Sequence, residues 1–210
     1  VIAFRRVDLS VGEFTGHLRK GAIKHVNVRD YSLKVDSLEI QQTLDTLIYR
    51  FSDLGTELNA LNIQTADSIF HLTLQSFQLS YRDKSIKLKG LVFKPNVSEA
   101  ALQKKYKYQH TDFSGAVGSL NFVNVNFDSL INRRKIFIDE IVLDTVAVSI
   151  FKDKTKPMDI NRMPLYLGQT VAAIPLPVLI KHVKATNVHH VNVERKPDST
   201  YATVNLNRAT

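Results

Sequence analysis

The chain has 210 residues, of which 44% are hydrophobic, and it carries a formal net charge of +8 at pH 7. These values fit a folded chain with a sizeable apolar surface and exclude a disordered or low-complexity one. The lack of cysteine excludes disulfides, thiol catalysis and thiolate-bound metals. The two densest basic clusters, in residues 104–107 and 133–135, lack the interleaved aromatics of a single-strand nucleic-acid platform, so no nucleic-acid partner is predicted.

One apolar spacing recurs along the chain, with successive steps of three, two, three, two and two residues. Steps of two keep side chains on one face of a β-strand. A step of three keeps the same face only if a β-bulge or kink absorbs the extra residue. Units that share these steps kink together, which predicts a mainly β fold built as a strongly curved, elongated antiparallel sheet. Complete copies occupy residues 23–35, 69–81 and 138–150, and shorter ones occupy 2–11, 86–93, 117–127 and 180–193.

Two polar segments bear on where the strands turn. The short link from Arg82 to Ser85 joins two units and predicts a hairpin. Arg29 and Asp30 lie inside the first complete unit, where a turn would split it into two short strands. We favour a single long strand there, with the turn as the alternative.

Helical insertions are expected near residues 96–107, 128–134 and 159–173. Asn96 followed by Glu99 is a capping-box signal that opens the first helix. Asp128 is the expected cap of the second helix. The third segment contains Pro164 and Gly168, which favour an irregular crossover with one helical turn.

No catalytic residue, metal site or cofactor is predicted. The histidines lack the spacing of a helical zinc site, and His189 and His190 would point to opposite faces of a strand. Asp139 and Glu140 are adjacent and would diverge in the same way, whereas paired acid–base work needs two converging carboxylates. The histidines are therefore interpreted as polar residues of strand surfaces.

Several short motifs, which together span residues 65–208, resemble the AsmA-like envelope proteins of Bacteroidetes-type bacteria. A strand ends in Lys-Asp-Lys-Thr-Lys-Pro, a proline-containing crossover follows, and Ile-Pro-Leu-Pro leads into the next long strand. The chain departs from the family pattern at Val178, where leucine is common, and by the absence of the expected inner-membrane anchor. The segments that carry the resemblance are 91–96, 138–143, 151–157, 163–165, 174–177 and 180–194.

The resemblance implies one elongated β-groove over residues 1–210, as a fragment of a longer periplasmic chain anchored in the inner membrane by a segment outside the fragment. It also implies a role in envelope maintenance, with phospholipid or another acyl lipid held along an apolar groove and no catalytic residues. A closed sandwich or barrel, with the same residues as ordinary core, is the alternative fold. A non-catalytic scaffold that joins an envelope protein partner through its edge strands is the alternative function. The candidate groove face consists of Ile69, Leu72, Leu74, Phe77, Leu79, Val117, Leu120, Phe122, Ile138, Ile141, Leu143 and Val146.

Overall fold

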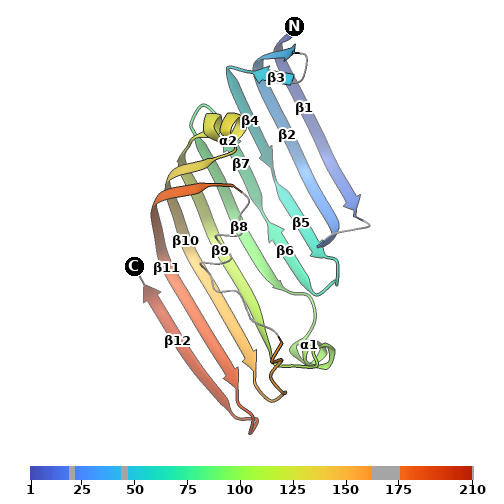
Figure 1. The fold of residues 1–210 in the computed structure, drawn as a ribbon, viewed down its shortest axis with the longest axis vertical. Helices are drawn as coiled ribbons and strands as arrows, with labels where there is room; N and C mark the ends of the chain where they lie inside the picture. Colours follow the sequence, from blue (N-terminus) through green and yellow to red (C-terminus); the bar gives the residue numbers. More distant parts are fainter. Residues whose placement is uncertain (19–21, 44–46, 162–175, 210) are drawn as a thin grey trace.

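The computed structural model describes residues 1–18, 22–43, 47–161 and 176–209, and its strands form one large, strongly twisted sheet (Figure 1). The two helices in this part of the chain are short and lie at the ends of strands. The predicted mainly β, curved and open sheet is confirmed. The elements are β1 (Ile2–His17), β2 (Ile23–Gln42), β3 (Leu47–Arg50), β4 (Asp53–Leu58), β5 (Ala60–Thr65), β6 (Phe70–Leu74), β7 (Ser76–Ser80), β8 (Ser85–Pro95), α1 (Glu99–Lys105), β9 (His110–Val125), α2 (Phe127–Arg133), β10 (Ile136–Asp153), β11 (Val178–Arg195) and β12 (Tyr201–Ala209).

The short strands join end to end into long ones. β3, β4 and β5 all pair with the same edge of β2, whose other edge pairs with β1. β6 and β7 likewise follow one another along β8. Among the described strands, β1 pairs only with β2 and β12 only with β11, so the sheet has two free edges and does not close.

One pairing departs from the predicted antiparallel order. β10 and β11 are parallel, whereas the other pairings described are antiparallel. Parallel neighbours need a crossover connection, which agrees with the crossover predicted between these strands. Most of the third predicted helical insertion, at 159–173, lies outside the described residues. In its described part, Asp159 Oδ1 accepts a hydrogen bond from the Asn161 backbone N–H at 3.1 Å.

Several of the three-residue steps of the repeat coincide with kinks. Asp30, Gly90, Thr145 and Asn187 each lie within such a step and have a positive φ, between 48° and 61°. A residue in this left-handed region bends the strand without ending it. β2 accordingly runs unbroken through Asp30, which confirms the single long strand, and the predicted hairpin joins β7 to β8.

The kinks lie in register across the sheet. Gly118 lies between the paired positions Ser119–Lys89 and Val117–Leu91, so it faces Gly90 on one side. On its other side it faces Thr145 in the same way. These positions form one line across the sheet, which we call the central kink row, and its members in β2, β8, β10 and β11 have the positive φ of a kink. Its members are Gly12, Asp30, Asn59, Gln75, Gly90, Gly118, Thr145 and Asn187.

Both helices begin at caps other than those predicted. α1 is capped by Ser98, whose hydroxyl accepts from the Ala101 N–H at 3.3 Å, rather than by Asn96. α2 is capped by Asn126, whose Oδ1 accepts from the Ser129 N–H at 2.9 Å. The predicted cap Asp128 lies instead in the first turn of α2. In both helices the capping side chain accepts from the N–H three residues later, which is the normal capping geometry. The prediction was therefore wrong only in the choice of cap, which lies two residues from the predicted one.

The sheet encloses little core. The accessible surface is 14705 Å², whereas a compact 23.8 kDa monomer is expected to expose about 9,900 Å². The excess arises because a single sheet leaves at least part of both faces open. Buried apolar side chains in the described residues are few, and they comprise Val35, Ile69, Leu74, Leu102, Val125, Phe127 and Ile138.

Candidate functional site

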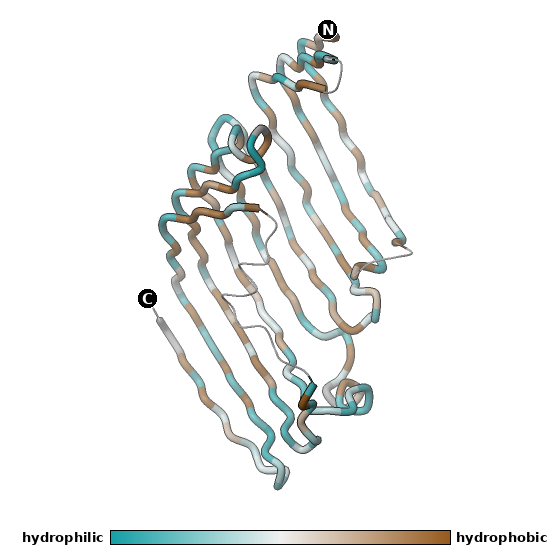
Figure 2. Tube along the Cα trace, viewed as in Figure 1, coloured by the Kyte–Doolittle hydropathy of each residue, from teal (hydrophilic) through white to brown (hydrophobic). Residues whose placement is uncertain are grey.

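The candidate site is the apolar face of the sheet, which the strand register builds. Leu120 of β9 is paired with Leu88 of β8 and with Leu143 of β10, and Leu88 is also paired with Phe77 of β7. Directly paired residues point to the same side of a sheet. They therefore form an apolar row that runs across four strands. Figure 2 shows the matching alternation of hydrophobic and hydrophilic residues along the strands.

The predicted groove residues all fall on this face or beside it. Ile69 immediately precedes β6 and is buried. The others lie in β6, β7, β9 and β10, and the three-residue steps keep them on one side, as the repeat predicts. Further apolar rows lie on either side of the Leu120 row. In one, Val117 is paired with Leu91 and with Val146, and in another, Phe122 is paired with Ile86 and with Ile141. Two more apolar pairs are Leu72 with Phe93 and Ile138 with Val125.

The apolar face extends beyond the predicted residues into the first strands. Phe14 of β1 is paired with Val28 of β2, which is paired with Leu61 of β5, and Leu61 is paired with Leu74. A pocket of about 330 Å³ lies here, lined by Val11, Phe14, Val28 and Tyr31. The same repeat that identified the later strands was present in residues 2–11 and 23–35, and it was the available signal for this part of the face.

The opposite face is mixed, because it carries polar rows beside an apolar row in which Val92 is paired with Ala116. Lys87 is paired with Gln78 on one side and with Asn121 on the other. Gln78 also donates from Nε2 to Glu57 Oε1 at 2.9 Å. The polar rows are stable in water without a covering layer.

Much of the apolar face is open to solvent. Phe14 is 56% exposed near one edge of the sheet. Val183 of β11 is 65% exposed although it is paired with Ile141 in one of the central rows. Soluble proteins rarely leave a continuous apolar surface of this extent uncovered. The face therefore indicates a ligand or a partner rather than a finished core.

α2 covers one end of this face. Phe127 forms a buried cluster with Val125 and Ile138, and Leu130 packs against the same cluster. The Phe127 ring also lies 5.7 Å from the Tyr81 ring, centroid to centroid, in a stacked arrangement. The helix thus seals the end of the face where β7 turns into β8.

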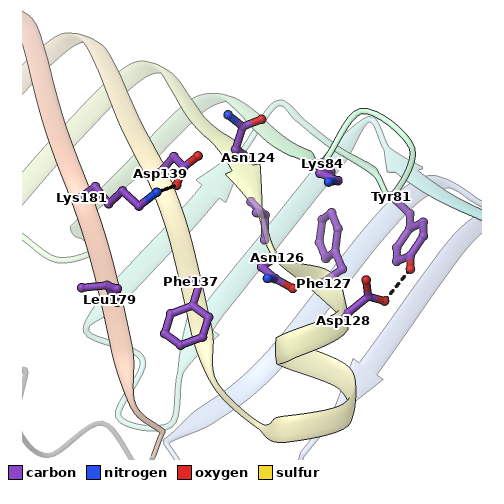
Figure 3. A pocket seen from close by; sticks show the side chains of 11 residues that line it. Tyr81, Lys84, Asn124, Asn126, Phe127, Asp128, Phe137, Asp139, Leu179 and Lys181 are labelled. Carbon is purple, nitrogen blue, oxygen red and sulfur yellow. Dashed lines mark hydrogen bonds and ion pairs between the residues drawn. The ribbon is translucent and has the colours of Figure 1, made fainter.

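A pocket of about 660 Å³ lies beside α2 (Figure 3). Its apolar lining includes Phe127, Phe137 and Leu179. Its polar lining combines Lys84 from the β7–β8 turn with Asp128 of α2. Asn124, Asn126, Tyr81, Val125, Asp139 and Lys181 complete the lining.

Two charged contacts order this pocket. Lys181 Nζ lies 2.6 Å from Asp139 Oδ1, and this hydrogen-bonded ammonium, helped by Asn124, holds the pKa of Asp139 below its ordinary value. The Tyr81 hydroxyl donates to Asp128 Oδ1 at 2.6 Å. That hydrogen bond, with burial, raises the pKa of Tyr81 because losing the proton would place two negative charges together.

A buried polar cluster lies at the other end of β9, beside α1. His110 Nε2 is 3.2 Å from Asp112 Oδ2, and both side chains are almost fully buried. Burial raises the pKa of Asp112, against the attraction of His110. Asp153 is paired with His110 and accepts hydrogen bonds from the backbone and the hydroxyl of Thr155. The prediction that the histidines lie on strand surfaces is therefore wrong for His110. Its burial depends on the pairing of β9 with β10, which the local sequence does not reveal.

Across the described ranges, no group of three or more histidine, aspartate or glutamate side chains is placed to hold a metal ion. None of the helices seen in the structure has the length and apolar character needed to span a bilayer. No protein-family model, no curated protein and no solved structure matches the chain significantly.

Proposed function

We propose that the protein is a non-catalytic lipid-binding segment, which holds the acyl chains of phospholipid or another acyl lipid against its apolar face. The observation that supports this most is the set of apolar rows that run across the strands with no second sheet above them in the described chain. Because the rows lie perpendicular to the strands, a bound acyl chain would cross the sheet from β2 towards β11. Each CH₂ group removed from water contributes about 0.8 kcal/mol, so a single chain offers substantial binding energy.

The biological setting rests on the AsmA-like resemblance. We propose a periplasmic place for this segment, in a longer chain anchored to the inner membrane and engaged in envelope maintenance. The open, single-layered sheet with an apolar face is the form such a groove requires. The polar rows of the opposite face agree with a groove that stands in water on its other side.

The direct experiment is native mass spectrometry of the purified chain, followed by extraction and identification of bound lipid. Retained phospholipid is the expected result, and a clean protein mass in the folded chain would contradict the proposal. Leu74 is a poor site for a test because it is 5% exposed, so a charge there would damage folding.

Exposed positions give a better test of the face. The double variant Phe14→Asp, Val183→Asp places two charges on the apolar side and is expected to abolish lipid retention with little loss of stability. The matched control Thr15→Asp, His189→Asp places the same charges on exposed positions of the same strands, on the opposite face. Equal lipid retention by the two double variants would argue against the apolar face as the binding surface.

A scaffold function is the second candidate, and the free edge of β1 favours it. β1 is 16 residues long and its outer edge is unpaired among the described strands. Long free edges recruit further strands. A stoichiometric protein partner that co-purifies with the chain, without lipid, would favour this function over the first.

A further inference from the structure

Two histidines meet at one end of the edge strand β1. His17 of β1 is directly paired with His25 of β2. The Leu18 N–H donates to the Lys24 carbonyl at 2.9 Å, so Leu18 and Lys24 are a hydrogen-bonded pair and the neighbouring His17 and His25 are a non-hydrogen-bonded pair. Side chains approach one another most closely in pairs of this second kind. The strand pairing therefore brings together two imidazoles that lie eight residues apart in the chain.

The two rings present the same atom to each other. His17 Nδ1 lies 3.3 Å from His25 Nδ1, and the ring centroids are 4.7 Å apart. A tetrahedral zinc ion bound to two imidazole nitrogens at about 2.0–2.1 Å places those nitrogens about 3.3–3.4 Å apart. The square-planar arrangement typical of Cu²⁺ would bring them to about 2.8–3.0 Å at the same bond lengths. The observed separation therefore matches the tetrahedral ion.

We propose that His17 and His25 form a zinc site, with Nδ1 of each ring as a ligand and water in the two remaining positions. Neutral imidazole is a common zinc ligand. In the metal-free pair, the short contact requires one ring to donate its Nδ1 proton to the other. When zinc binds, that ring releases its Nδ1 proton to solvent and takes up a proton at Nε2, so both rings remain neutral.

The site is open to a metal ion and separate from the apolar face. His17 is exposed and His25 is half-buried. Val26 alternates with His25 along β2, and it is paired with Ile63, which is paired with Leu72 of the apolar face. The two histidines therefore point to the opposite side of the sheet. Zinc binding here does not depend on the proposed lipid function.

The consequence of binding falls on β1, which pairs with β2 alone among the described strands. A zinc ion shared by His17 and His25 would fasten the last residues of β1 to the sheet. The unfolded chain does not hold the two rings at this spacing, so zinc binds the native state preferentially and stabilises it by mass action.

The experiment titrates the full chain, free of any affinity tag, with zinc chloride in a calorimeter, and repeats urea unfolding with and without the metal. One zinc ion per chain and an unfolding midpoint that rises with zinc concentration are expected. His17→Gln and His25→Gln should each abolish both effects, and the double variant should lose no more than either single one, because a chelate needs both rings. His71→Gln is the matched control and should bind zinc normally, since His71 lies in the same cross-strand row, two strands beyond His25.

Two further measurements make the result decisive. The unfolding midpoint without metal should be nearly unchanged in each variant, which shows that the variants fold. Nitrogen-15 spectra of the imidazoles should show both rings protonated at Nε2 in the zinc-bound protein. Stoichiometric binding that survives in either single variant, partial losses that add in the double variant, or unchanged imidazole spectra at saturating zinc would overturn the proposal. Absence of zinc binding by wild type would overturn it too, and would leave the two histidines as a hydrogen-bonded pair.

Discussion

Gly118 of β9 lies directly across from Thr145 of β10, and a Cβ atom added at Gly118 would come within 2.9 Å of the Thr145 Cβ. Thr145 itself has a φ of 55°, a conformation that β-branched residues rarely adopt. The pair belongs to the central kink row. The two strands are therefore closely packed at this point of the row.

Gly118→Ala is expected to destabilise the protein by about 1–3 kcal/mol, because the new methyl group meets a neighbouring strand that cannot move away alone. Urea unfolding followed by circular dichroism measures the change. Gly12→Ala is the matched control, since Gly12 lies in the same row and a Cβ there meets nothing within 4 Å. Equal losses in the two variants would show that the contact with Thr145 does not limit this position.

Thr145→Gly is expected to stabilise the protein by about 1 kcal/mol, because relief of the left-handed conformation outweighs the added freedom of the unfolded chain. The substitution also removes the Cβ that a side chain at position 118 would meet. In a double-mutant cycle, Gly118→Ala should therefore cost less in the Thr145→Gly background than in wild type. Strictly additive effects would contradict the proposed contact.

The kinks show how far the repeat alone can predict this fold. Asp30 and Asn187 lie where the apolar spacing increases from two residues to three, so the positions of these two kinks could be predicted from the pattern. The same pattern placed Leu120 and Leu143 on one face, and the register confirms it. Local spacing suffices here because a strand repeats every two residues.

Features that depend on pairing between distant strands could not be predicted in this way. The His110–Asp112 pair is buried only because β10 and α1 lie beside the end of β9, and nothing in the spacing of residues 110–112 signals this. The polar pocket was missed for the same reason. Lys84, Asp128 and Lys181 lie on three separate elements that meet only in the folded sheet.

The cap of α2 offers a test of how this helix covers the apolar face. Asn126→Ala removes the acceptor for the Ser129 N–H and is expected to destabilise the protein by about 1 kcal/mol. Because Phe127 follows the cap, loosening the first turn should also expose the Val125–Ile138 cluster and increase the fluorescence of a hydrophobic dye. Ser98→Ala removes the cap of α1 and is the control. Dye binding that rises equally in both variants would contradict a specific role for α2.

Asp112 gives the fold a pH dependence of unusual sign. Burial raises its pKa above the ordinary value of 3.8, so the ionised carboxylate opposes folding above the raised pKa and has no such effect below 3.8. Asp112→Asn should therefore stabilise the protein at pH 7.5, because a neutral amide costs less to bury than an ionised carboxylate. The gain should shrink as the pH falls and vanish near pH 3, as measured by thermal unfolding across this range.

Asp198 is the control for this prediction because its pKa is shifted the other way. The Thr200 hydroxyl and backbone N–H hydrogen-bond to its carboxylate and lower its pKa, so the ionised form supports folding above the ordinary pKa. Asp198→Asn should lose a little stability at pH 7.5, and the loss should disappear at low pH. A gain from Asp112→Asn that persists unchanged at pH 3 would mean that shape, rather than the charge beside His110 and Asp153, determines the effect.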